Sequence, residues 1–170
     1  MNIHLVDKTF LKKPGSYIIQ SLLAVIAVAV ILYFVETITQ AAIVAALGAS
    51  SFIVFAMPKT VAAEPRRLIG GHITGIVCGL VCYYGCYSSP TETFFNSNEI
   101  IHWLPAAFAV GLSIFLMTIF NFEHPPAAGT ALGIVAHEWT WETIVFIVVF
   151  AISLAIIGIL LKKYLKNLCT

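Results

Sequence analysis

The amino-acid sequence predicts an all-helical membrane protein that crosses the bilayer several times and forms a single transmembrane domain, residues 1–170. Apolar residues make up 60% of the chain and charged residues only 10%. A soluble domain carries about a quarter charged residues. The apolar residues also fall into six runs separated by polar connections, which is typical of a polytopic protein. This composition excludes a separate soluble enzymatic domain, and no basic stripe indicates nucleic-acid binding.

Six apolar segments are expected to form the membrane helices. A full span needs about 17–25 residues, so the second segment is marginal and the fifth is short. The run that follows Lys12 and Lys13 is too long for the apolar part of a signal peptide, so we expect it to remain as the first span. No transit segment precedes it, which favours a prokaryotic plasma (inner) membrane. In order, the segments are Tyr17–Val35, Ala41–Met57, Leu68–Tyr87, Trp103–Phe120, Pro126–His137 and Thr143–Leu161.

The basic residues predict the orientation of these segments. Cytoplasmic connections carry an excess of Lys and Arg, so both termini and the Pro58–Arg67 connection are predicted to be cytoplasmic. This arrangement needs an even number of crossings, and the short fifth segment is therefore counted as one. The basic residues are Lys8, Lys12, Lys13, Lys59, Arg66, Arg67, Lys162, Lys163 and Lys166.

The two halves of the chain, residues 16–88 and 103–163, suggest a 3+3 inverted repeat. Each half has three segments, and its unusual segment comes second. When Gly48 is laid on Gly129, Ala46 matches Ala127. Paired interrupted segments in two inverted halves point to a transporter site at the repeat interface. The alternative is that these are two unrelated packing glycines in ordinary helices.

The two interrupted segments also predict an anion site. Pro125 and Pro126 cannot lie inside a helix but can begin one, and a second helix start is expected near Gly48. Free N–H groups and a partial positive charge at such starts attract anions near the middle of the bilayer. Alternatively, the hydroxyl groups bond to carbonyls of their own helices. The candidate substrate-binding residues are Gly48, Ala49, Ser50, Ser51, His124, Pro125, Pro126, Ala127, Gly129 and Thr130.

Glu123, Arg66 and His72 are further candidates for gating or for tuning this site. His124 could gain charge as an anion arrives and so couple transport to a proton, with Glu123 adjusting its pKa. His124 could instead cap a helix at the headgroup level. His72 could close the cytoplasmic side together with Arg66 and Arg67, although the arginines could instead set the topology and His72 could be an interfacial residue.

Cys78, Cys82 and Cys86 recur every four residues on one face of the third segment. The same segment carries Gly71, Gly75 and Gly79, so a ridge of small residues that lets a helix approach closely is favoured over a thiol cluster. This face is also a candidate for contact between two copies of the chain. The spacings predict no metal site, disulfide or cofactor.

Two blocks of the sequence resemble the HPP family of integral membrane proteins. One is His124-Pro125-Pro126 followed by Ala127-Ala128-Gly129-Thr130-Ala131. The other comprises Gly48-Ala49-Ser50-Ser51, Pro58, Glu64-Pro65-Arg66 and Gly70-Gly71-His72. This resemblance implies a small membrane transporter or channel for an inorganic anion, with nitrite as its cargo, and not an enzyme. Two other hypotheses are a membrane enzyme or redox module that uses His72, His124 and the cysteines, and a non-transporting assembly subunit.

Overall fold

The computed structural model describes residues 14–34, 41–88, 103–137 and 139–169, and these form helices without any strand. Each of the six predicted segments corresponds to one helix, with ends that agree to within three residues. The elements are α2 (Pro14–Phe34), α3 (Ala41–Ala56), the 3₁₀ helix η1 (Val61–Ala63), α4 (Pro65–Tyr87), α6 (Leu104–Ile119), α7 (Pro126–Ala136) and α8 (Trp141–Leu161). The all-helical prediction is confirmed.

Proline marks the beginning of most of these helices. Pro14, Pro65, Pro105 and Pro126 all stand at the first or second position of a helix. Proline is tolerated there because its missing N–H has no partner within the helix in any case. At the end of α6 the chain reverses through Asn121, whose φ of 55° is left-handed, a conformation that Asn adopts more readily than most residues. These local signals explain why the sequence predicts the helix ends well.

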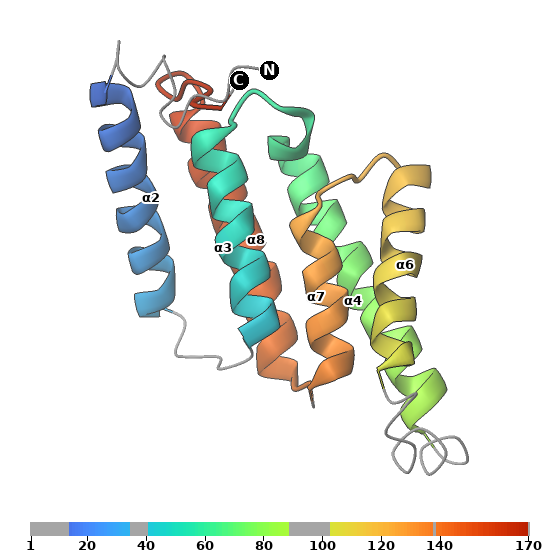
Figure 1. The fold of residues 1–170 in the computed structure, drawn as a ribbon. Helices are drawn as coiled ribbons and strands as arrows, with labels where there is room; N and C mark the ends of the chain where they lie inside the picture. Colours follow the sequence, from blue (N-terminus) through green and yellow to red (C-terminus); the bar gives the residue numbers. More distant parts are fainter. Residues whose placement is uncertain (1–13, 35–40, 89–102, 138, 170) are drawn as a thin grey trace, which may run out of the picture.

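Successive helices alternate in direction, and α7 lies between α3, α4 and α6 (Figure 1). We call one end of the bundle the basic end, because it holds every Lys and Arg among the residues that the structure describes. These are Lys59, Arg66, Arg67, Lys162, Lys163 and Lys166. The start of α2, the 57–64 connection and the segment after α8 all lie there, as the charge pattern predicted. The opposite, aromatic end carries Tyr83, Tyr84, Trp139 and Trp141, whose rings pack together.

Length and apolarity mark α4 and α8 as helices able to cross a membrane, whereas α3, α6 and α7 are shorter apolar helices. At 1.5 Å per residue, the 11 residues of α7 reach about 16 Å, roughly half the hydrocarbon thickness. The short helix nevertheless runs from the basic end towards the aromatic end (Figure 1). Its contacts with α3, α4 and α6 surround most of α7 with protein, whereas Pro125 and Ala136 at its two ends are exposed.

The second segment differs from the prediction that a helix starts near Gly48. α3 runs without a break through Gly48, so no helix starts there. Gly48 and Ala49 are exposed on its outer face. A glycine inside a helix costs only about 1 kcal/mol, which helix packing easily offsets. Because α3 begins at the aromatic end and α7 at the basic end, two opposed helix starts do not meet at mid-depth. The inverted repeat itself stays a prediction.

The glycine ridge on α4 packs against α7 of the same chain. A Cβ added to Gly79 would lie 2.9 Å from the Ile134 Cβ, and one added to Gly75 would collide with the Ala127 carbonyl. Close helix approach over small residues is therefore confirmed. α7 of the same chain thus covers these glycines, and contact between two copies of the chain stays a prediction. Cys78 and Cys82 are buried in a core cluster with residues of α6 and α7, and Cys86 is half-buried.

Candidate functional site

Four buried polar side chains meet inside the bundle near the basic end. They are Ser50 of α3, His72 of α4, His124 of the connection before α7, and Thr130 of α7, all at most 1% exposed. The Ser50 hydroxyl lies 2.9 Å from His72 Nε2 and 2.8 Å from His124 Nε2. On its other side, His72 Nδ1 lies 2.8 Å from the Thr130 hydroxyl. We call these four residues the imidazole network.

The network continues to the backbone at the basic end. His124 Nδ1 lies 2.8 Å from the carbonyl oxygen of Ala62 in η1. The two imidazole rings are 5.2 Å apart between centroids and tilted by 57°. Burial lowers the pKa of His124, and the bond to the Ala62 carbonyl opposes that effect in part. The surroundings of His124 therefore favour its neutral form.

Small residues bring the three helices close enough to form this network. A Cβ on Gly71 would lie 2.7 Å from the His124 Cβ, so only glycine allows His124 to reach α4 at this position. On the other side of α7, a Cβ on Gly129 would lie 3.0 Å from the Ala46 Cβ of α3. Gly129 was a candidate anion contact; in the structure it sets the spacing between α7 and α3.

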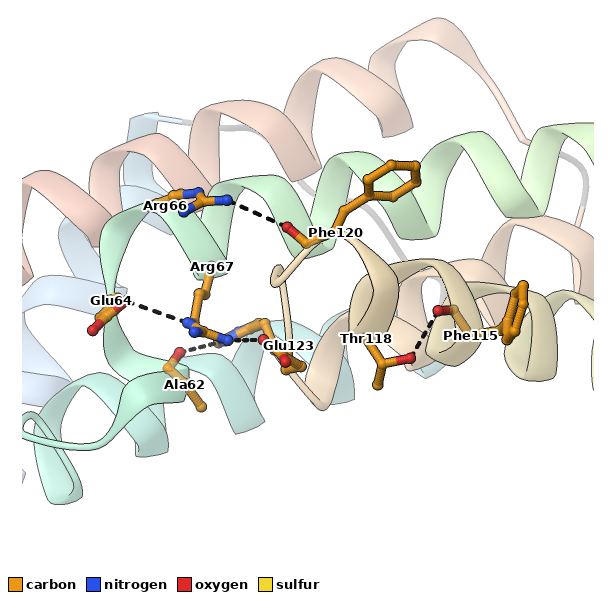
Figure 2. Close-up of polar contacts among 9 residues, drawn as sticks. Ala62, Glu64, Arg66, Arg67, Phe115, Thr118, Phe120 and Glu123 are labelled. Carbon is orange, nitrogen blue, oxygen red and sulfur yellow. Dashed lines mark hydrogen bonds and ion pairs between the residues drawn. The ribbon is translucent and has the colours of Figure 1, made fainter.

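A cluster of ion pairs covers the network at the basic end. Arg67 lies between two carboxylates, 3.2 Å from Glu64 and in direct contact with Glu123 (Figure 2). Arg66 donates to the Phe120 carbonyl at 3.3 Å and stacks over the Phe122 ring, 5.2 Å from its centroid. These contacts fasten the start of α4 to the connection that carries His124.

Next to the network, an apolar groove of about 280 Å³ separates the end of α6 from the start of α7. Its lining includes Glu123, His124, Pro125 and Ala128. A water molecule occupies about 30 Å³ in the liquid, so the groove has room for a small inorganic ion.

Some predicted site residues lie outside this network. The Ser51 hydroxyl donates to Leu47 of its own helix at 3.1 Å, as the alternative hypothesis expected. Pro125 is exposed, whereas Pro126 and Ala127 are buried at the start of α7. The Ala127 N–H already donates to the His124 carbonyl at 2.9 Å, so it is not a free donor.

Sequence reasoning missed two features of the site. His72 was expected at an interface with Arg66, but it is buried and joins Ser50 and Thr130. The ion pair between Arg67 and Glu123 was not predicted either. A histidine inside an apolar helix was the available signal, because an ionisable residue at such a position is a functional candidate by default.

Within the described part of the chain, the network holds the only groups of the bundle centre that can become positive. α3, α6 and α7 contain no Asp, Glu, Lys, Arg or His. In α4 the single such residue after Arg67 is His72, and the connection before α7 adds His124. An anion that passed between these helices would find no other cationic partner on them beyond Arg66 and Arg67 at the start of α4.

Comparison with known proteins places this arrangement in a family. The transmembrane region that defines HPP proteins matches residues 11–168. The chain belongs to the HPP family. It is also 33% identical over 126 residues to a transmembrane protein of Dictyostelium discoideum, an alignment that covers 74% of this chain but 41% of that relative. The chain thus spans less than half the length of that protein. No solved structure matches the chain significantly.

The two blocks that resemble HPP proteins meet at the imidazole network. Ser50 comes from the Gly-Ala-Ser-Ser block and His72 from the Gly-Gly-His stretch. His124 and Thr130 come from the block that begins with His-Pro-Pro. Segments far apart in this HPP chain therefore bring their polar residues to one buried place.

Proposed function

We propose that this HPP protein is a membrane transporter or channel for a small inorganic anion, with nitrite as its cargo, and that the imidazole network is its central site. The observation that carries the proposal is the buried pair His72 and His124, enclosed by α3, α6 and α7, which contain no charged residue. Nitrite as the cargo rests on the family resemblance.

An imidazole pair suits transport better than a fixed cation would. Polar and ionisable residues inside a membrane bundle are costly and mark ion pathways more often than packing sites. A neutral imidazole avoids that cost while the site is empty, and it becomes an attractive partner once protonated. A Lys or Arg would keep its charge throughout and hold the anion after passage. The site can thus bind and still release.

Catalysis at the same residues is the competing hypothesis, because a serine beside two histidines could form a nucleophile and its base. Ser50 is fully buried between α3, His72 of α4 and His124 before α7, so a substrate carbonyl would have to displace the packing of α3 against these neighbours. A small ion needs much less space. We therefore propose transport and not an enzymatic activity.

The proposal includes an orientation. With the positive-inside rule, the basic end faces the cytoplasm, and Glu123, Arg67 and Glu64 stand at that mouth. We further propose the prokaryotic plasma membrane as the location. The bilayer surrounds the outer faces, where large apolar side chains such as Phe108 are exposed.

Uptake into liposomes tests this function. The purified chain is reconstituted, and the accumulation of nitrite, nitrate, formate and chloride is measured against protein-free liposomes. The double variant His72→Gln with His124→Gln should lower uptake at least tenfold, because loss of a buried partner of an ion costs more than about 1.4 kcal/mol. The matched control is His137→Gln, which changes an exposed histidine at the aromatic end.

The outcomes separate the parts of the proposal. Uptake of one of these anions by the chain and by His137→Gln, with loss in the double variant, supports transport through the network. If nitrate or formate enters and nitrite does not, nitrite as cargo is wrong. If no anion accumulates above the protein-free level, the transport proposal is refuted.

A further inference from the structure

The hydrogen bonds of the imidazole network can be assigned a direction. A carbonyl only accepts, so His124 Nδ1 must carry a hydrogen for its bond to Ala62. In a neutral ring, His124 Nε2 then accepts from the Ser50 hydroxyl. Ser50 has no second hydrogen, so His72 Nε2 donates to it. His72 Nδ1 is left to accept from Thr130.

One contact of the network has no hydrogen in this neutral arrangement. The Ser50 hydroxyl also lies 3.0 Å from the Ala46 carbonyl, which can only accept. Five contacts therefore share the four hydrogens that two neutral imidazoles and two hydroxyls provide. Ser50 can satisfy either Ala46 or His124, but not both.

One added proton completes the set. With a hydrogen on His124 Nε2, Ser50 accepts from His124 and His72 through its two lone pairs and turns its own hydrogen to Ala46. All five contacts are then made without movement of a heavier atom. A second proton would put two cations 5.2 Å apart in a buried site, which their repulsion disfavours.

We propose that the imidazole network binds a single proton together with a single monovalent anion, so that transport is an electroneutral symport. This inference rests on the proposed function. Binding of either ion alone is unfavourable, because a buried imidazolium lacks a counter-charge and a buried anion lacks a cation. Each ion therefore raises the affinity for the other, as linkage requires.

The surrounding charges agree with this pairing. Near His124 the charged groups are Glu123, Glu64, Arg67 and Arg66, two carboxylates and two guanidinium groups whose charges balance at the basic end. α3, α6 and α7 contribute no ionisable group. Apart from Arg66 and Arg67, α4 contributes His72 and the cysteines and tyrosines of residues 78–87, which carry no positive charge. Among the described residues, no fixed carboxylate is thus placed to neutralise the added proton in the network, which leaves that role to the anion.

The first test reads the hydrogens directly. Nitrogen-15 NMR of the full chain in lipid, with labelled histidine, should show the Nδ1–H tautomer for His124 and the Nε2–H tautomer for His72 near neutral pH. Assignments come from single His→Gln variants. Added nitrite should convert one imidazole signal to imidazolium. The opposite tautomers, or two imidazolium signals without any anion, would overturn the inference.

The second test measures the coupling in liposomes with an internal pH dye. We expect about one proton to enter with each nitrite ion, and uptake that is unchanged when potassium and valinomycin set the membrane potential. Ser50→Ala should lower the coupled uptake at least tenfold. Ser113→Ala is its control, because Ser113 is equally buried and its hydroxyl donates to Val110 in its own helix.

The two proposals fail in different ways. Anion uptake that follows the membrane potential and carries no proton overturns the symport but leaves the transporter proposal intact. Absence of all anion uptake, with no change in the imidazole signals when nitrite is added, refutes both. Should Ser50→Ala fail to fold, the tautomers and the proton-to-nitrite ratio of the unmodified chain still decide the question.

Discussion

Replacement of Gly71 by alanine should loosen the contact between α4 and the connection that carries His124. The added Cβ would lie 2.7 Å from the His124 Cβ, 3.0 Å from the Phe122 carbonyl and 3.3 Å from the Ala127 Cβ. Ordinary contacts lie at 3.4–4 Å, so all three neighbours have to retreat. Retreat of His124 also lengthens its 2.8 Å contact with Ser50.

The magnitude follows from two opposed effects. Overpacking of a well-packed interior costs about 1–3 kcal/mol. The change from Gly to Ala inside a helix contributes about 1 kcal/mol in the favourable direction. Gly85→Ala in the same helix gains the second effect without the first, since its Cβ would meet nothing within 4 Å. We therefore expect Gly71→Ala to be less stable than Gly85→Ala by about 1–3 kcal/mol.

Unfolding of both variants in the same lipid or detergent measures this difference. Gly71→Ala should unfold at the lower temperature and also lose nitrite uptake, whereas Gly85→Ala should unfold slightly above the temperature of the unmodified chain and keep its uptake. Equal stability and equal uptake in the two variants would refute the close packing of α4 on His124, and with it the steric need for a glycine before His72.

Three further predictions concern the basic end and the ionisation of the network. Cysteines that replace Lys59 and Lys163 should react with a membrane-impermeant reagent from one side of the membrane, and a cysteine that replaces Glu142 should react from the other side. Labelling of positions 59 and 163 from opposite sides would contradict the alternating direction of the helices. Gln20→Leu should destabilise the chain by about 1–3 kcal/mol, because the Gln20 side chain hydrogen-bonds to the Phe55 carbonyl and to the backbone N–H and carbonyl of Lys166. Unchanged thermal unfolding would show that these hydrogen bonds contribute nothing to stability. Since burial lowers the pKa of His124 below the usual 6.5, the unfolded chain binds its proton first, and the free energy of unfolding should fall by up to about 1.4 kcal/mol per unit as pH drops below 6.5. His124→Gln should flatten this part of the profile, and identical profiles for both chains would contradict a buried neutral His124.

Much of the fold followed from local signals, and much of the site did not. The proline pair at 125–126 correctly predicted a short helix that ends near His137. The helix start predicted near Gly48 was wrong, because a lone glycine lowers helix stability only slightly and α3 continues through it. The serine at 50 and the histidine at 124 were singled out from separate motifs, but neither motif indicates that the two side chains touch.

The sequence by itself determined that the chain has segments suited to a membrane and in what order its helices follow one another. Runs of apolar residues fix which segments can lie in hydrocarbon, proline fixes where helices begin, and the positions of Lys and Arg fix which connections share an end. The tertiary structure alone decided which polar residues meet. Helix periodicity gives the face on which a side chain lies but not the depth or rotation at which that face docks, and these depend on packing. In this bundle Gly71 and Gly129 set that docking, so His72 lies in the centre of the network and not at the expected interface.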